Sequence, residues 1–122
     1  LPEGHPQIAG SLNNLAGLYR SQGRYGEAEP LFLEGLAIRR KSLPEGHPDI
    51  ATSLNNLAYL YQVQGRYGEA EPLYLEAAQT IMKSLGKQHP NTQTVLNNYL
   101  SFLRKRNKEA EVTAFLKEWE LT

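Results

Sequence analysis

Paired asparagines are the most distinctive chemistry-bearing residues in the chain, and they recur at positions 13–14, 55–56 and 97–98. An amide side chain carries both a hydrogen-bond donor and an acceptor. A row of amides could therefore hold the peptide groups of an extended ligand whatever its side chains are. Asparagine is also a mediocre helix former, so its repetition within predicted helices has a cost that a local purpose would offset. The pairs indicate a surface that grips polypeptide backbone.

The alternative interpretation of the pairs is structural. One asparagine of each pair would bond a neighbouring helix or loop and hold successive repeats in register. Adjacent residues point about 100° apart around a helix, so both members of a pair cannot face a ligand equally. Side-chain direction favours the second member. The predicted ligand-facing residues are Asn14, Asn56 and Asn98, ahead of Asn13, Asn55 and Asn97.

The three histidines of the chain, His5, His47 and His89, are candidate metal ligands by residue type. Their spacing argues against a shared ion because they occupy the same position in successive repeats. Packed helices already lie ~8–10 Å apart, too far for three such side chains to reach one ion at ~2 Å. We predict instead that each histidine caps or packs against the start of a helix, and we expect no metal or other cofactor.

Charged residues follow the predicted helix ends. Two short basic runs, at 39–41 and 104–108, lie near helix C-termini, where cations meet the negative end of the helix dipole. Arg20, Arg104 and Lys105 could in addition receive an acidic side chain or a terminal carboxylate of a ligand. No catalytic triad, phosphate loop or zinc-helix motif is present, and the distinctive features recur, whereas a catalytic site should be singular. We predict that the protein is not an enzyme.

Composition argues against several other functional classes. Thirteen basic residues balance 13 acidic residues, while a protein that neutralises the phosphates of nucleic acid or membrane would show a basic excess. The chain has no cysteine, which excludes disulfides and thiolate metal sites and makes a reducing, cytoplasmic location the default. No apolar run approaches the ~18 residues of a membrane span, and the N-terminal residues lack the pattern of a signal peptide.

An internal repeat of 42 residues contains all of these features. Residues 1–42 and 43–84 are identical at 30 positions, including Ser-Leu-Asn-Asn-Leu-Ala at 11–16 and 53–58. A third, degenerate copy keeps the same offset as far as Asn98. It is then predicted to lose two residues near Lys108, so that 109–111 align with 69–71 at an offset of 40. We expect three units, at 1–42, 43–84 and 85–122, the last acting as a C-terminal cap.

Each unit is predicted to form two antiparallel helices. Apolar residues at helical spacings indicate a first helix, A, over about 48–64 and a second, B, over about 68–85 of the second unit. Pro48 suits the first turn of helix A, and Gly65 follows it as a C-terminal cap. No β-strand pattern appears. A hairpin cannot bury its apolar face alone, so the three units should stack as an all-α solenoid of six helices, a right-handed superhelix with a concave face of A helices.

The blocks Leu-Asn-Asn-Leu-Ala and Gln-Gly-Arg-Tyr-Gly-Glu-Ala-Glu-Pro-Leu, with a linker carrying His-Pro, resemble the tetratricopeptide repeat (TPR) in its 42-residue form, as found in kinesin light chains. The resemblance covers essentially the whole chain and is weaker after Asn98, where Asn107 replaces the turn glycine. It implies an α-solenoid scaffold that binds an extended peptide segment, with helix A asparagines holding the peptide backbone.

The same resemblance places particular residues on the groove. The predicted peptide-binding residues are Asn13, Asn14, Arg20, Thr52, Asn55, Asn56, Tyr59, Gln62, Asn97, Asn98, Ser101, Arg104 and Lys105. The asparagines would hold the backbone, while Arg20, Tyr59, Arg104 and Lys105 would select side chains. We expect a protein or peptide partner, and neither nucleic acid nor membrane.

An alternative function is that of an architectural spacer within a longer TPR array, with the ligand contacts elsewhere. In that case Ile8 and Leu12 of the first unit would lack a cover, and the exposed apolar face would promote end-to-end self-association.

Overall fold

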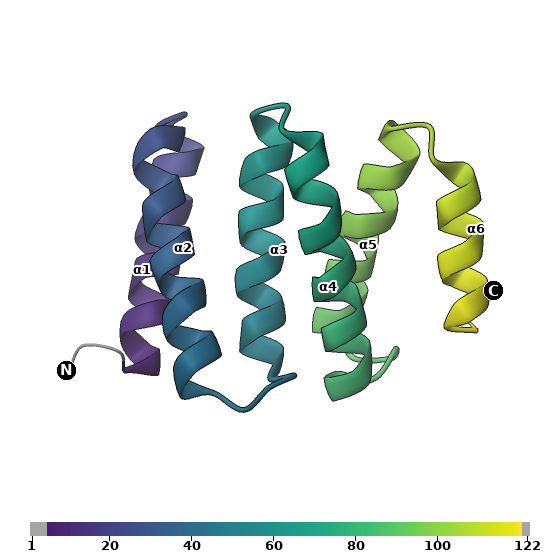
Figure 1. The fold of residues 1–122 in the computed structure, drawn as a ribbon, viewed down its shortest axis with the longest axis horizontal. Coiled ribbons are helices and arrows are strands. Elements are labelled where there is room, and N and C mark those ends of the chain that lie inside the picture. Colours follow the sequence, from purple (N-terminus) through teal and green to yellow (C-terminus); the bar gives the residue numbers. More distant parts are fainter. Residues whose placement is uncertain (1–4, 121–122) are drawn as a thin grey trace.

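The computed structural model describes residues 5–120, so the outer ends of the first and third units, at 1–4 and 121–122, lie outside it. Within this range the chain forms six helices and no strand: α1 (Pro6–Ser21), α2 (Tyr25–Ser42), α3 (Pro48–Val63), α4 (Tyr67–Leu85), α5 (Pro90–Lys105) and α6 (Glu109–Glu118). The predicted boundaries of α3 and α4 agree with these to within one residue. Figure 1 shows the helices following one another along the length of the molecule, which is the arrangement expected of an α-solenoid.

The A helices, α1, α3 and α5, all begin in the same way. His5, His47 and His89 are their N-caps, and the Nδ1 atom of each accepts a hydrogen bond of 3.0–3.1 Å from the backbone N–H two residues later. A proline follows each histidine at the first helical position, where its missing N–H has no intrahelical acceptor to serve. The predicted capping role of the three histidines is confirmed.

The turns from helix A to helix B need a left-handed residue. Gly23 and Gly65 have φ values of 75° and 76°, a region that glycine enters without steric cost. Asn107, which replaces the glycine in the third unit, has φ 60°. Asparagine tolerates this conformation better than most residues, so the substitution keeps the turn.

The third unit keeps the 42-residue register into α6, and the predicted two-residue deletion near Lys108 is wrong. Helix α4 begins at Tyr67 and α6 begins at Glu109, an offset of 42. Buried Val112 occupies the place of buried Ala70, while Ala110, which sequence comparison aligned with Ala70, is exposed. The Glu-Ala-Glu similarity was misleading because burial, and not the identity of three residues, fixes the helix phase.

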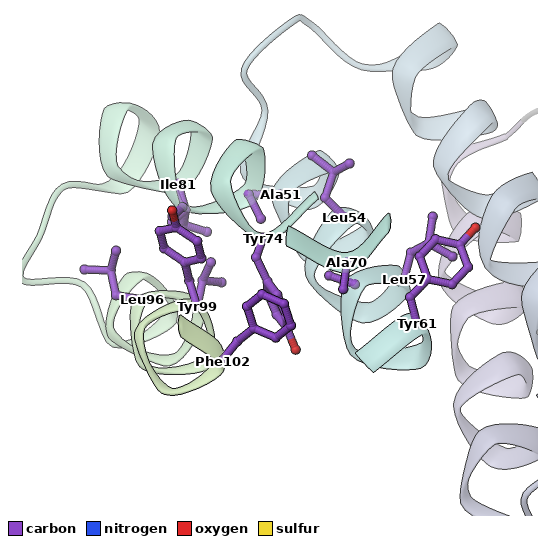
Figure 2. Packing of buried hydrophobic residues seen from close by; sticks show 14 of the residues in the cluster. Ala51, Leu54, Leu57, Tyr61, Ala70, Tyr74, Ile81, Leu96, Tyr99 and Phe102 are labelled. Carbon is purple, nitrogen blue, oxygen red and sulfur yellow. The ribbon is translucent and has the colours of Figure 1, made fainter. Parts of the chain in front are cut away.

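The core contains both small and aromatic residues. Five alanines are fully buried, and their small side chains let the helices approach closely: Ala16, Ala28, Ala58, Ala70 and Ala77. Phe32 and Tyr74 fill the space between helices, and the rings of Tyr74 and Phe102 lie 5.1 Å apart across the junction of the second and third units (Figure 2). One continuous cluster of buried residues therefore joins the three units.

A polar clamp also joins each unit to the next. The Glu29 carboxylate accepts hydrogen bonds from Arg66, at 2.6 Å, and from the hydroxyl of Tyr61, at 3.2 Å. One repeat later, Lys108 lies 2.7 Å from Glu71. The second glutamate of the Glu-Ala-Glu block thus bridges to the following unit, a role that its position near a helix N-terminus did not reveal.

No helix in the described part of the chain is both long enough and apolar enough to cross a membrane.

Candidate functional site

The A helices form a continuous layer because α3 contacts both α1 and α5 directly. A hollow of about 310 Å³ opens on this layer at the junction of the second and third units. Residues from the end of α3, the start of α4 and the end of α5 line it: Tyr59, Gln62, Val63, Tyr67, Phe102, Lys105 and Arg106. Three of the predicted groove residues, Tyr59, Gln62 and Lys105, are therefore brought together here.

Exposed apolar side chains distinguish this hollow. Tyr59, Val63 and Tyr67 are 41%, 39% and 38% exposed, although they lie beside the buried ring of Phe102. Large apolar side chains that remain open to solvent around a concave surface are typical of binding sites.

Arginines lie over two of these rings. The Arg20 guanidinium is 4.9 Å from the centre of the Tyr59 ring, and that of Arg106 is 4.3 Å from the centre of the Tyr67 ring. Both contacts are within the range of cation–π attraction. Arg20, which sequence analysis predicted as a selector of ligand side chains, thus lies next to the hollow from the neighbouring unit.

Gln62 has a fixed orientation in the hollow. Its Oε1 atom accepts a hydrogen bond of 2.6 Å from the hydroxyl of Tyr74, which is fully buried. Burial raises the pKa of Tyr74, so the hydroxyl keeps the proton that it donates. The amide N–H₂ of Gln62 is left as the group that can donate to a ligand.

The asparagine pairs divide between the two roles considered for them. Asn13 is buried and donates through Nδ2 to the Ser53 hydroxyl of the next unit, at 3.3 Å. Asn98 donates in the same way to Oδ1 of Asn55, also at 3.3 Å. Asn55 and Asn98 are half-buried, and these bonds link consecutive units as the structural interpretation predicts. Asn13 therefore cannot present its amide to a ligand without first leaving the junction.

The remaining members of the pairs are accessible. Asn14 and Asn97 are exposed, and Asn56 is half-buried. Their side chains form no hydrogen bond with the described residues. Of the three second-position asparagines, Asn14 and Asn56 have amides free to contact a ligand, whereas that of Asn98 is shared with Asn55.

A local difference in packing explains why the two junctions use their asparagines differently. A Cβ atom on Gly35 would lie 2.9 Å from Oδ1 of Asn13, so the glycine leaves space for that side chain to turn inward. Arg39 completes the junction by donating to the Ser53 hydroxyl at 3.0 Å. One repeat later the corresponding residues are Ala77, Ile81 and Val95. These three positions are apolar in the second junction, so Asn55 has no counterpart of the Ser53 hydroxyl to bond and pairs with Asn98 instead.

The other predicted groove residues lie on the surface without a shared site. Thr52 donates its hydroxyl to the carbonyl of Pro48, and Ser101 is exposed. Arg104 is exposed, with its Nε 3.9 Å from Glu109, and it does not line the hollow. Sequence analysis missed Tyr67, Phe102 and Arg106. The available signal was that Arg106 replaces Gln64 of the preceding unit, a departure from the repeat beside a groove position.

A larger hollow, of about 550 Å³, lies at the opposite end of the helices, where the linker between the first and second units meets α4. Its lining residues carry both charges, and two of them, Arg40 and Glu76, are 2.9 Å apart and bonded to each other. The apolar side chain in its lining, Ile50, is buried. It therefore lacks the exposed apolar surface of the hollow around Tyr59. Among the described residues no group of three or more histidine or acidic side chains could hold a metal ion.

Comparisons with known proteins agree with this architecture. The tetratricopeptide repeat family matches the chain over residues 8–49 and again over 49–118. No curated protein sequence matches the chain.

Solved structures of kinesin light chain-like proteins are similar to it. One, from Podosopora anserina with nearly identical TPR-like repeats, has a TM-score of 0.83 at 27% identity over 97% of this chain. A variant of that protein with a single substitution has a TM-score of 0.76 at 26% identity over 99% of this chain. BtubC (BKLC) of P. vanneervenii has a TM-score of 0.74 at 28% identity over 84% of this chain. The chain spans 56%, 57% and 41% of the lengths of these proteins, respectively.

These similarities confirm the all-α repeat fold and its likeness to kinesin light chains that the repeated blocks predicted. Repeats of this type generally mediate protein–protein interactions, and scaffolds built from them are typically non-enzymatic. Two family matches together span residues 8–118, and the described residues form six helices in three stacked hairpins, which establishes that the chain belongs to the tetratricopeptide repeat family.

Proposed function

We propose that the protein binds an extended peptide segment of a partner protein along its A helices, with the hollow at the junction of the second and third units as the main anchor. The observation that carries the proposal is the cluster of three exposed apolar side chains, Tyr59, Val63 and Tyr67, around this hollow. They would cover an apolar side chain of the peptide, and the area removed from water would supply much of the affinity.

Polar groups around the hollow would orient the peptide. The free N–H₂ of Gln62 would donate to a peptide carbonyl, and Asn56, which lies closer to the middle of α3, would extend the same contact along the backbone. Arg20 and Lys105 approach from the two neighbouring A helices, so acidic groups on either side of the apolar anchor would be attracted.

The test is a peptide-library screen with the wild-type chain, followed by affinity measurements on a Tyr59→Ser variant. Leu33→Ser is the matched control, since Leu33 is 43% exposed, close to the 41% of Tyr59, and does not line the hollow. We expect Tyr59→Ser to lower the affinity for the selected peptides at least about tenfold, ~1.4 kcal/mol, and Leu33→Ser to leave that affinity unchanged. Equal effects of the two substitutions would contradict the proposal.

A further inference from the structure

Leucines on the outer side of the first unit are exposed where their counterparts in later units are buried. Leu15 and Leu18 of α1 are 41% and 54% exposed. The corresponding Leu57 and Leu60 of α3 are 2% and 0% exposed, and in α5 the same positions hold buried Tyr99 and Phe102. Leu33 of α2, at 43%, is likewise more exposed than Leu75. We call Leu15, Leu18 and Leu33, with Tyr19 and Arg24 at their edge, the leading face.

Internal comparison identifies what buries these positions. In the first and second units alike, helix A packs against its own helix B, so the partner within the hairpin does not cause the difference. The second unit differs in having a unit before it. Figure 2 shows Leu57 and Tyr61 on the side of α3 that is turned toward the first unit. In the second and third units, the surface that corresponds to the leading face is therefore covered by the hairpin that precedes it.

Arg24 shows the same difference in hydrogen bonding. Arg24 and Arg66 lie over Tyr19 and Tyr61, at 4.4 and 4.2 Å from the ring centres, and each bonds a glutamate three residues later. Arg66 also binds Glu29 of the preceding unit, together with the Tyr61 hydroxyl. Within the described residues Arg24 has a carboxylate partner only in its own unit, Glu27.

We propose that the leading face seats a further helical hairpin of this repeat, one that presents a glutamate to Arg24 and Tyr19 and buries Leu15 and Leu18. The required partner resembles the first unit closely. Its asparagine and arginine at the positions of Asn13 and Arg39 would meet Ser11, which occupies in the first unit the place that Ser53 has in the second.

The third unit does not meet these requirements. Thr113 takes the place of Glu29 and Glu71, and exposed Gln93 takes the place of buried Ala9 and Ala51. Stacking of one chain's C-terminal end on the leading face of a second copy would therefore leave Arg24 without its carboxylate. The face selects a hairpin of the first-unit kind, which distinguishes it from a general apolar patch.

The test uses the chain extended by a second copy of residues 1–42 placed before Leu1. This fusion joins Ser42 to Leu1 and so reproduces the natural sequence of Ser42 followed by Leu43. In the extended chain, two residues that should face each other across the new junction are changed to Gln, singly and together. They are the glutamate of the added copy that corresponds to Glu29, and Arg24 of the original first unit. The Glu29→Gln and Arg66→Gln pair in the original chain is the matched reference. Urea unfolding followed by circular dichroism gives the midpoints and slopes.

We expect one transition with a steeper slope and a higher midpoint in the extended chain, because unit interfaces add stability between neighbours. For the added glutamate and Arg24, the midpoint shift of the double variant should differ from the sum of the two single shifts. This difference should equal the one measured for Glu29 and Arg66. Leu18→Ser should lower the midpoint of the extended chain while leaving that of the original chain nearly unchanged. A separate low-urea transition for the added copy, or additive effects of the two charge changes, would overturn the proposal. So would sedimentation showing that the original chain forms a dimer that Leu18→Ser dissociates, since the face would then belong to a second copy.

Discussion

His47 stabilises the start of α3 through a single acceptor atom, Nδ1, which receives the N–H of Asp49 at 3.0 Å. Replacing an N-cap acceptor with alanine typically costs ~1 kcal/mol, so we expect His47→Ala to lower the free energy of unfolding by about that amount. His47→Asn keeps a side-chain acceptor and should be nearly neutral. Urea unfolding of both variants checks this, and equal losses would show that the imidazole contributes through packing instead of capping.

Gly35 should resist replacement by alanine although it lies inside a helix. Glycine to alanine in a helix interior normally stabilises by ~1 kcal/mol, and Gly17→Ala, where a Cβ meets nothing within 4 Å, should show that gain. At position 35 the new Cβ would lie 2.9 Å from Asn13 Oδ1, so we expect Gly35→Ala to destabilise.

The same contact predicts a rescue. In an Asn13→Ala background the obstructing side chain is absent, and Gly35→Ala should then become neutral or stabilising. A double-mutant cycle in urea measures the interaction between the two positions. If Gly35→Ala is equally harmful in both backgrounds, the obstruction comes from the Ala9 carbonyl, at 3.3 Å, and not from the amide.

At the scale of helices, the clamp formed by Glu29 is the feature whose removal should loosen one junction specifically. Glu29→Gln leaves the shape of the side chain but weakens its bonds to Arg66 and Tyr61. Since the pair is partly exposed, we expect a loss of ~1 kcal/mol or less in unfolding free energy, which should diminish at high salt. Exposed Glu34, which bonds none of the described residues, provides the control in Glu34→Gln; a similar loss there would rule out the clamp as the cause.

Helix positions followed from local sequence, whereas the contacts between units did not. Proline, histidine and glycine mark the ends of α3 because each acts within a few residues along the chain. The Glu29–Arg66 bond joins residues 37 positions apart and depends on how two hairpins are stacked. The register of the third unit was mispredicted for the same reason. Burial of Val112 in the core sets the phase of α6, and this burial depends on how the hairpins are stacked.

The candidate site was predicted only in part. The resemblance to the TPR family placed Tyr59, Gln62 and Lys105 on the groove, and the structure gathers them around one hollow. Tyr67 and Phe102 escaped prediction because they come from the start of a B helix and from a buried position, and only stacking of the second unit on the third brings them to this surface. Sequence alone also could not predict that Asn13 turns inward whereas Asn55 does not. The space for the Asn13 side chain is left by Gly35, which lies on another helix.

At the scale of the whole molecule, stability should vary along the solenoid. Helix α3 buries eight of its residues, whereas α1 buries three and α6 two. Because each unit contacts only its neighbours, the end helices can open without disrupting the middle. We expect hydrogen exchange to be slowest in α3 and fastest in α1 and α6. Uniform protection across all six helices would show instead that the chain opens only as a single cooperative unit.

The polar junction between the first two units has a consequence for how the chain can evolve. Residues 1–42 and 43–84 are identical at 30 positions, so a chain in which the second unit was lost would still place similar repeats side by side. If the first unit were placed directly before the third, Asn13 and Arg39 would face Val95 where Ser53 now receives their hydrogen bonds. Asn13 is buried, and a buried polar group without a partner is costly, so this junction should be less stable than the one between the first and second units. The Asn13–Ser53–Arg39 contact therefore favours the second unit over the third as the neighbour of the first.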